Sequence, residues 1–171
     1  MILEDQKKID NTVGSRSRIN LAYIAGFLDG DGSVMLQVKK RPDGKNKFRF
    51  MATICFYQDT RHERDLYWIR KVFGIGYISK RNDGMTELRI NGYSQVENII
   101  TLLYPFVRFK KSQCKSLLKA CKILSSTKYK LLKEKQLRKV VKYILEIQNQ
   151  NYVTKRKKTE EELLKIIGLT P

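Results

Sequence analysis

Residues 20–33 read NLAYIAGFLDGDGS, and this stretch decides the fold. Every residue from 21 to 28 is apolar or small, and the run is too short to cross a membrane. It predicts one helix that is buried nearly all round. Ala22, Gly26 and Gly30 recur every four residues, so they form a narrow stripe on which another backbone can approach closely. That backbone belongs either to a second copy of the chain or to another helix of the same chain.

Two carboxylates, Asp29 and Asp31, lie where this helix should end. The negative end of the helix dipole disfavours acidic side chains, and a bound cation would reverse that penalty. Each acid is followed by a glycine, which lets the chain bend so that carboxylate and carbonyl oxygens face one point. An EF-hand calcium loop is excluded, because Val34 and Lys40 stand where such a loop needs glycine and glutamate. The pattern favours a different metal site built from oxygen ligands.

Residues 24–32, IAGFLDGDG, resemble the motif that names the LAGLIDADG homing endonucleases. The identical positions are Ala25, Gly26, Asp29, Asp31 and Gly32. The resemblance extends over about residues 18–168 and is greatest to the single-motif, homodimeric branch of the family. It implies an α+β fold with an αββαββα core, a four-stranded antiparallel saddle that binds DNA, and C-terminal helices.

Composition sets independent limits on the domain organisation and on the partner. The 171 residues are 42% hydrophobic, enough for one domain with a proper core. We expect residues 1–17 to form a disordered tail and residues 18–171 a single domain, with a core at about 18–110 and a helical part at about 111–171. No signal peptide or transmembrane span is recognisable. A net charge of +18 indicates a polyanionic partner, nucleic acid rather than a membrane surface.

Cysteine and histidine usage argues against a zinc site or a disulfide framework. The three cysteines, Cys55, Cys114 and Cys121, are odd in number and lack metal-ligand spacing, and His62 is the only histidine. We expect reduced thiols in the core or in strands.

The pattern after residue 33 predicts two hairpins separated and followed by helices. Residues 34–41 and 48–58 alternate apolar and polar side chains and predict paired strands. Residues 77–81 and 86–91 predict a second pair across an Asp-Gly turn. Thr60 with Glu63 and Ser94 with Glu97 have the spacing of capping boxes, which predicts a helix at each place.

The C-terminal third predicts basic helices. Residues 108–158 contain 17 basic and two acidic side chains, while apolar positions keep helical spacing. Residues 155–158 are expected to contact phosphates, although a solvated loop is nearly as good an interpretation. Thr159 and Glu162 predict the cap of a last helix that ends at Gly168.

The first hairpin is strongly basic and fits a DNA major groove, where its polar side chains can read base edges. A merely solvated hairpin is the alternative. With the resemblance included, the expected DNA-facing residues are Gln37, Lys39, Arg41, Lys47, Arg49, Ser79, Arg81, Glu87 and Arg89.

The expected chemistry is metal-assisted hydrolysis of phosphodiester bonds. Asp31 is the expected carboxylate ligand of Mg²⁺ and the carbonyl oxygen of Gly30 a second ligand, while Asp29 caps the turn or holds solvent. One carboxylate is too few for a stable metal site, so two Asp31 residues should meet across a homodimer. The resemblance implies such a meeting at the base of paired motif helices, with the dimer interface at Ala22, Gly26 and Gly30.

Three more catalytic positions follow from the resemblance. Gln58 matches a polar residue that orients water, and Lys110 matches a basic residue near the scissile phosphate. His62 stands where similar family members carry Arg or Lys, so either His62 or one of its neighbours Arg61 and Arg64 supplies the cation.

The resulting hypothesis is a magnesium-dependent homing endonuclease that cuts both strands of a pseudo-palindromic DNA target. Mn²⁺ is expected to substitute, and Ca²⁺ to bind without efficient cleavage. The resemblance implies an intron-encoded protein of a chloroplast or mitochondrion. One alternative is a splicing maturase that binds intron RNA or DNA without cutting. A basic ribosome- or membrane-associated structural protein is another, but it leaves the two acids at the helix end unexplained.

Overall fold

The computed structural model describes residues 16–41, 48–126, 132–151 and 156–170. Helices and strands follow one another in the predicted αββαββα order, and further helices follow them. The elements are α1 (Arg18–Asp31), β1 (Gly32–Lys40), β2 (Phe48–Asp59), a 3₁₀ turn (Thr60–His62), α2 (Arg64–Phe73), β3 (Tyr77–Lys80), β4 (Met85–Asn91), α3 (Tyr93–Leu103), α4 (Lys111–Ser126), α5 (Glu134–Gln150) and α6 (Glu160–Ile167). None of the helices within these ranges is long and apolar enough to cross a membrane.

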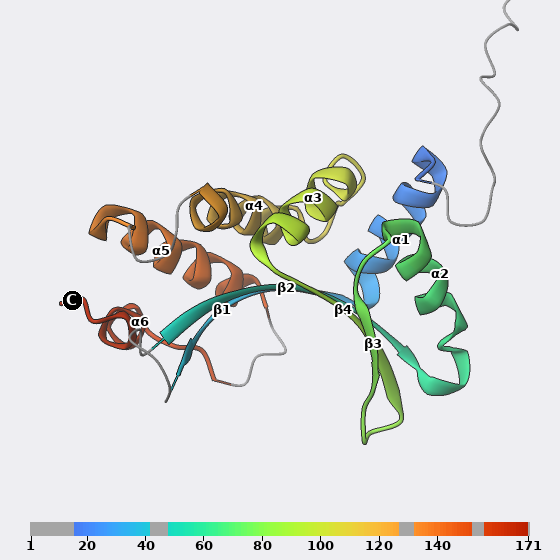
Figure 1. The fold of residues 1–171 in the computed structure, drawn as a ribbon, viewed down its shortest axis with the longest axis horizontal. Coiled ribbons are helices and arrows are strands. Elements are labelled where there is room, and N and C mark those ends of the chain that lie inside the picture. The colour runs from blue at the N-terminus through green and yellow to red at the C-terminus, as the bar shows by residue number, and fades with distance from the viewer. Residues whose placement is uncertain (1–15, 42–47, 127–131, 152–155, 171) are drawn as a thin grey trace, which may run out of the picture.

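The strands form one antiparallel sheet in the order β1-β2-β4-β3. Figure 1 shows that the sheet is curved, with α3, α4 and α5 over one face and α1 and α2 at one end. α6 lies below α5, beside the free end of β1. The concave face between the two hairpins is the predicted saddle, and the α+β prediction is confirmed.

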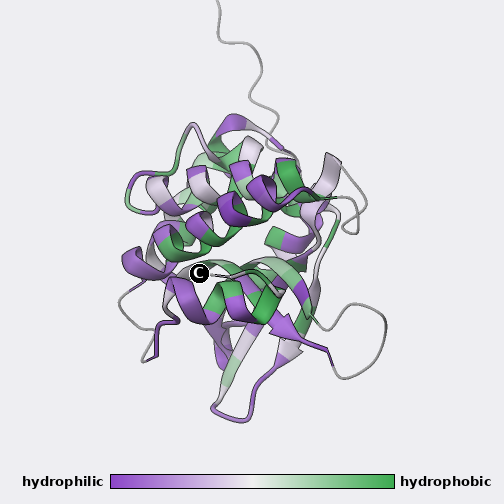
Figure 2. Cartoon of the chain, turned by 90° about the vertical axis from the view of Figure 1, so that its left-hand side faces the viewer, coloured by the Kyte–Doolittle hydropathy of each residue, from purple (hydrophilic) through white to green (hydrophobic). Residues whose placement is uncertain are grey.

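Alternation of side chains along β1 and β2 explains which face is covered. Val34, Leu36 and Val38 are at most 5% exposed and point to the helices, as do Phe50 and Ile54 on the neighbouring strand. Together with residues of α1 to α6 they form one hydrophobic cluster. In Figure 2, hydrophilic and hydrophobic colours alternate along the helices above the sheet, as expected of amphipathic helices with one buried side.

The prediction that α1 is buried nearly all round is wrong for the single chain. Leu21, Ile24 and Leu28 are buried against the core, but the opposite side of the helix is exposed. Ile19 is 54% and Tyr23 is 67% exposed. One apolar side of α1 therefore finds no cover within the described part of the chain.

Two predicted capping boxes are also wrong, the first because a tertiary partner binds the side chain and the second because the helix begins earlier than predicted. Glu63 precedes α2, but its carboxylate accepts a hydrogen bond from Thr86 of β4 at 2.7 Å. Ser94 lies inside α3, whose N-cap is Gly92 with φ 101°. That φ value lies in the region that favours glycine.

The predicted capping box of α6 is confirmed. The Thr159 hydroxyl accepts from the backbone N–H of Glu162 at 3.2 Å, and the Glu162 carboxylate accepts from the backbone N–H of Thr159 at 2.9 Å. The helix ends at Gly168, which has φ 78°. Here no distant side chain within the described ranges competes, so the local pattern decides the structure.

Arg16 and Ser17, which we assigned to the disordered tail, make defined contacts. Arg16 donates to the carbonyl oxygens of Val72 and Phe73 at 3.1 and 2.7 Å. Ser17 is the N-cap of α1 and accepts from the backbone N–H of Asn20 at 3.2 Å. The rest of that predicted tail lies outside the described residues.

A reciprocal clamp joins the end of α1 to the turn before α4. The buried carboxylate of Asp29 accepts from the backbone N–H groups of Arg108 at 2.6 Å, Phe109 at 3.2 Å and Lys110 at 2.9 Å. In return, the Lys110 ammonium donates to the backbone carbonyl of Asp29. Two segments that lie 79 to 81 residues apart are thus bonded side chain to backbone in both directions. We expected Asp29 to cap the turn at the end of its own helix or to hold solvent, whereas its carboxylate caps a distant turn.

Replacing Asp29 by Asn tests this clamp. The amide has only one acceptor oxygen, so at least one buried N–H loses its partner, and we expect the free energy of unfolding to fall by about 1–3 kcal/mol. The measurement is urea unfolding followed by circular dichroism.

Asp31→Asn is the matched control, with the same substitution two residues further along. Asp31 is exposed and lies in the last turn of α1, where a negative charge is unfavourable. Its replacement should leave the stability unchanged or slightly raised. Equal losses in the two variants would contradict the clamp.

Candidate active site and nucleic-acid interface

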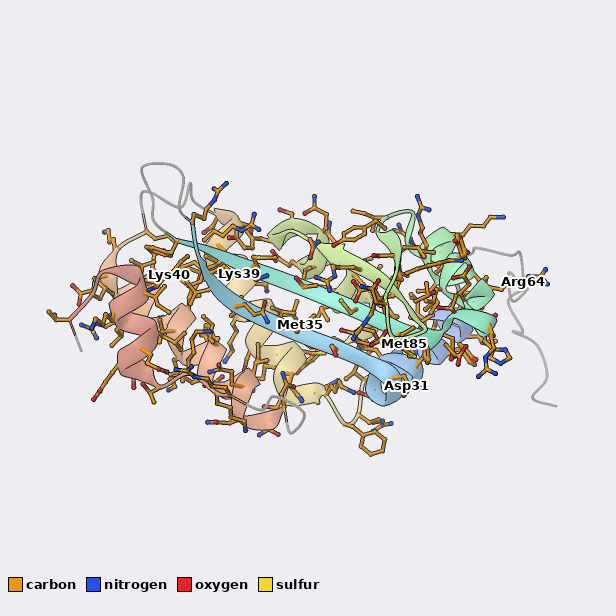
Figure 3. All side chains as sticks on the ribbon, turned by 90° about the horizontal axis from the view of Figure 1, so that it is seen from below. Asp31, Met35, Lys39, Lys40, Arg64 and Met85 are labelled. Atoms are coloured by element: carbon orange, nitrogen blue, oxygen red, sulfur yellow. The ribbon has the colours of Figure 1, made fainter. Side chains whose placement is uncertain are left out.

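Asp31 is the last residue of α1, and its side chain is exposed. Figure 3 shows it at one end of β1, from which the strand runs past Met35 to Lys39 and Lys40 at the other end. Gly30, which precedes Asp31, is also exposed. The carbonyl groups of the last turn of a helix lack intrahelical partners, so carboxylate and carbonyl oxygens are both available at this point.

Lys110 reaches the same end of α1 from the turn before α4. Besides the Asp29 carbonyl, its ammonium contacts the Gly30 carbonyl oxygen at 3.4 Å. Burial lowers the pKa of Lys110, and the charges of Asp29 and Asp31 oppose that shift. The sequence predicted that Lys110 and Asp31 serve one site, and the Asp29 clamp is what brings the lysine there.

Gln58 lies near the end of β2 on the same side of the molecule. Phe56, two residues earlier, pairs with Gly32 at the junction of α1 and β1. The side-chain oxygen of Gln58 accepts from the backbone N–H of Asp59 at 2.9 Å. This bond fixes the amide group at the strand end that is closest to the motif.

The three candidates for a further cation lie in or just after the 3₁₀ turn. Arg61 donates from Nε and Nη2 to the two carboxylate oxygens of Asp59 at 3.0 and 2.9 Å. These bonds lower the pKa of Asp59. His62 is exposed, and Arg64 begins α2 at the edge of the molecule in Figure 3, away from Asp31. Since Arg61 is occupied by Asp59, His62 is the better candidate of the three.

The described residues of one chain do not provide a complete metal site. In the described ranges, no group of three or more His, Cys, Asp and Glu side chains is close enough to hold an ion. Asp31 and the Gly30 carbonyl are suitable hard oxygen ligands for Mg²⁺, but they are only two. The donor set therefore fits a divalent ion only if other molecules supply further ligands.

The concave face of the sheet, which we call the saddle floor, carries side chains in rows that cross the strands. The two outer rows, at the end of β1 that is far from Asp31, are Lys39–Arg49 and Gln37–Met51. The inner rows, toward Asp31, are Met35–Thr53–Asn91, Ser33–Cys55–Arg89–Tyr77 and Tyr57–Glu87–Ser79. Most of the predicted DNA-facing residues of the two hairpins belong to these rows. Arg41 and Arg81 lie just beyond the ends of β1 and β3, and Lys47 lies outside the described residues.

The outer end of the β1–β2 hairpin is basic and exposed. Lys39, Lys40, Arg41 and Arg49 are exposed, and none of them pairs with an acid in the part of the chain that the structure describes. Gln37 is exposed beside them. Side chains of these types can contact phosphates or read base edges in a major groove.

Several polar side chains of the inner rows bind one another. The Arg89 guanidinium bonds the Glu87 carboxylate at 2.9 Å, and Glu87 is only 7% exposed. Thr53 donates to Asn91 at 2.8 Å. Arg89 Nε is buried and makes no hydrogen bond to any described group. Glu87 and Arg89 thus face the saddle as predicted, but as a coupled pair rather than as two independent side chains.

Two tyrosines on the saddle floor were missed by the sequence analysis. Tyr57 shares the parity of Arg49 and Cys55 along β2, which was the available signal, and burial raises its pKa to about 12. Tyr77 lies directly opposite Arg89 and is 48% exposed. Both add aromatic contact area to the floor.

At the tip of the second hairpin, the structure ends β3 one residue earlier than predicted. Ser79 faces Glu87 in the register, but Arg81 lies beyond the strand. Arg81 pairs with Asp83 at 2.7 Å, and its guanidinium lies 5.8 Å from the ring centre of Tyr57. It remains close to the saddle although it is not part of a strand.

The small-residue stripe of α1 is not used inside the chain. Ala22, Gly26 and Gly30 are exposed, and a methyl group added at either glycine would meet no atom within 4 Å. The stripe continues the exposed side that carries Ile19 and Tyr23. The alternative of an intramolecular helix crossing through the stripe therefore fails for the described residues, and contact with another molecule is left.

Comparison with known proteins agrees with the family resemblance of the motif. The family model of the LAGLIDADG endonucleases matches residues 24–124. DNA endonuclease I-CvuI of Chlorella vulgaris is 32% identical over 111 residues, 65% of this chain and 69% of that protein. DNA endonuclease I-CreI of Chlamydomonas reinhardtii is 31% identical over 110 residues, 63% of this chain and 66% of that protein. The alignments thus span about two thirds of each relative.

Solved structures extend the similarity over most of the chain. Two crystal structures of the homing endonuclease I-CvuI with DNA, one with Ca and one with Mg, are 27% identical to this chain. Each superposition covers 90% of this chain and 98% of that one, with TM-scores of 0.75 and 0.74. The motif at the end of α1, the antiparallel saddle and these matches establish that the chain belongs to the LAGLIDADG endonuclease family.

Proposed function

We propose that this protein is a homodimeric, site-specific endonuclease that cuts both strands of a long, pseudo-palindromic DNA target with divalent metal ions. One observation carries the proposal: Asp31 is exposed at the end of a helix whose free side is lined by small residues, beside a sheet with a basic outer end. The two relatives named above, both DNA endonucleases, support the same activity.

The dimer completes the active site. One chain offers Asp31 and the Gly30 carbonyl, which are too few ligands for a stable site. Two α1 helices that pack through Ala22, Gly26 and Gly30 bring two Asp31 carboxylates together at their common end. A two-fold axis through this contact relates two saddles, so each saddle reads one half of the target and the target is pseudo-palindromic.

Asp31, the Gly30 carbonyl and DNA phosphates would hold Mg²⁺. Bound there, the ion supplies neutralisation of phosphate charge and lowers the pKa of bound water. We propose that Mn²⁺ substitutes for it. Ca²⁺ is expected to support binding but little cutting, because its coordination geometry is looser.

The remaining site residues act on the phosphate and on water. The Lys110 ammonium, held at the end of α1, stabilises negative charge that develops on the scissile phosphate. Gln58 orients the attacking water through the amide group that its bond to Asp59 fixes. His62 supplies a second cation, since Arg61 is engaged by Asp59.

Direct base reading is assigned to the exposed outer rows, with Gln37, Lys39 and Arg49 in the major groove. Arg41 continues the basic edge beyond the end of β1. Glu87 acts by holding Arg89, and Ser79 and Arg81 contact the target from the second hairpin. We also propose, from the family resemblance, that the protein is intron-encoded and acts in a chloroplast or mitochondrion.

Asp31→Asn separates an endonuclease from a DNA- or RNA-binding protein that does not cut. The substitution removes the carboxylate ligand while the saddle stays intact, so cleavage should vanish. DNA affinity should persist or rise, because two carboxylates no longer repel the phosphate backbone. The target is first selected from a randomised DNA pool, and gel shift and cleavage are then measured with Mg²⁺ and Ca²⁺. Full cutting by the variant would remove Asp31 from the mechanism, and a wild type that binds but never cuts would favour the non-cutting alternative.

Gly26→Leu tests the dimer. In the single chain a Cβ atom added at Gly26 meets no atom within 4 Å, so the fold should persist, but in the dimer the leucine would hold the two α1 helices apart. We expect sedimentation as a monomer and loss of double-strand cleavage.

Asn98→Leu is the control for Gly26→Leu, because it adds a leucine at an exposed position of another helix, α3. It should sediment as the wild type does. A wild-type monomer that still cuts both strands would refute the role of the stripe.

Arg49→Ala tests base reading. If Arg49 makes a bidentate contact to guanine, the variant should lose about 1–3 kcal/mol of discrimination at one base pair of each half-site. Affinities for all single-base variants of the target give the measurement. Lys157→Ala is the comparison, since loss of a phosphate contact should weaken all sequences alike and reduce the salt slope by about one. Unchanged relative affinities in Arg49→Ala would show that this residue does not read a base.

A further inference from the structure

The helical side of the molecule carries a second basic surface that the proposed function does not use. Three lysines of α4 and three of α5 are exposed and repeat with the spacing i, i+4, i+7. We call them the lysine rows: Lys115, Lys119 and Lys122 on α4, and Lys135, Lys139 and Lys142 on α5. This spacing puts each row along one side of its helix.

Both rows point away from the saddle. The opposite sides of the two helices are buried, through residues such as Leu117 and Leu124 of α4 and Val140 and Ile144 of α5. These residues pack in the hydrophobic cluster with the covered face of the sheet. Figure 1 shows α4 and α5 above the sheet, while the concave face opens below. DNA bound in the saddle therefore does not reach the lysine rows.

The two rows lie side by side over part of their length, with Lys115 and Lys135 at opposite ends. Ser116 of α4 donates to Glu146 of α5 at 2.6 Å, and the Lys119 ammonium lies 6.0 Å from the ring centre of Tyr143. These contacts fix an antiparallel arrangement, because the residue number falls along α5 as it rises along α4. Extending the same pairing sets Lys119 near Lys142.

Acidic side chains do not neutralise the rows. α4 contains no acid, and the two acids of α5 are engaged elsewhere: Glu134 pairs with Arg138 at 2.8 Å, and Glu146 accepts from Ser116. None of the six lysines forms an ion pair with a described acid. A hollow of about 730 Å³ beside α5 is lined by the lysine row of this helix together with Arg138, Leu145, Glu134 and Glu160. The patch is thus positive on balance, and its six lysines form no ion pair with a described acid.

The dimensions of the patch match a DNA duplex. Each row covers about 10.5 Å along its helix, and packed helices lie about 8–10 Å apart. Each strand of B-DNA advances about 3.4 Å along the axis per phosphate, so about three phosphates face three lysines. The separation of the rows falls between the widths of the minor and major grooves, about 6 and 12 Å, so each row can reach a different strand.

Other nucleic acids fit less well. Single strands are bound by stacking on exposed aromatic rings, whereas Tyr143 is only half-exposed and lies near Lys119. An A-form RNA duplex has a narrow, deep major groove and a wide minor groove, so its strands are spaced differently from the two rows.

We propose that the lysine rows bind the phosphate backbone of a second B-form DNA duplex, without sequence preference, while the saddle holds the target. The proposal rests on the proposed function in so far as the saddle binds DNA. A dimer would then present one specific site and, on its far side, two non-specific sites, and it could join two segments of DNA.

The test is a bridging assay in Ca²⁺, which is expected to prevent cutting. The selected target duplex is attached to beads, the full-length protein is added, and a fluorescent duplex of about 20 random base pairs is then offered. The test variant carries Lys119→Gln, Lys122→Gln and Lys139→Gln. The control variant carries Arg70→Gln, Lys71→Gln and Lys165→Gln, which removes the same charge from exposed positions outside both surfaces.

We expect the wild type and the control variant to retain the fluorescent duplex, and the test variant to lose roughly tenfold or more of it. Binding of the target itself should stay within about twofold of the wild type. The slope of log affinity for the second duplex against log salt should fall by up to about three in the test variant. Circular dichroism verifies that both variants are folded.

Three results would overturn the proposal. The first is that the wild type retains the target but no second duplex. The second is that the test variant loses the target and the second duplex together. The third is that the wild type retains an RNA duplex as well as it retains DNA. If no protein retains the target, the proposed function fails instead. The fluorescent duplex is then titrated directly by anisotropy, and equal affinities of wild type and test variant would overturn the lysine rows as well.

Discussion

The fold and the candidate site both depend on the carboxylate of Asp29. This buried group accepts three hydrogen bonds from backbone N–H groups of the turn that precedes α4, and the Lys110 ammonium of that turn donates to the backbone carbonyl of Asp29 at the end of α1. Charge-assisted bonds of this kind are stronger than neutral ones, and a buried carboxylate without them would be costly. The clamp therefore fixes the C-terminal helices to the motif helix, and the same contacts bring Lys110 to Asp31.

The sheet separates stability from recognition by the simple alternation of its strands. Phe50, Ile54 and Phe56 point to the helices, while Arg49, Thr53 and Cys55 point to the saddle. A shift of the register by one residue would exchange these two sets, so the hydrophobic side also fixes the position of each polar side chain. Toward Asp31 the polar side chains bind one another, whereas the outer rows keep free donors. The polar side chains near Asp31 are thus held by one another, while those at the outer end of the sheet are available to bind another molecule.

Local patterns predicted those parts of the structure in which no distant group competes. The alternation of Val34, Leu36 and Val38 sufficed for β1, and the Thr159 capping box sufficed for α6. Patterns failed where a tertiary contact was stronger: Glu63 bonds Thr86 instead of capping α2. The partners of Asp29 lie about eighty residues away in the sequence, and a local pattern of residues cannot predict a contact over that distance. The family resemblance identified the candidate site residues, but it did not predict that Glu87 and Arg89 form an ion pair with each other.

The exposure of Asp31 is itself an argument for function. Several acids of this chain form stabilising bonds: Asp29 holds the clamp, Glu63 bonds β4, Glu87 pairs with Arg89, and the Glu162 carboxylate accepts from the backbone N–H of Thr159 at the start of α6. Asp31 forms no hydrogen bond or ion pair with another described group, and it lies in the last turn of a helix, where a negative charge costs about 0.3–1 kcal/mol. Packing gives no reason for a carboxylate there. A cation would, because it turns the unfavourable charge into a ligand, and in the proposed dimer the nearby small-residue stripe would bring a second such carboxylate from the partner chain.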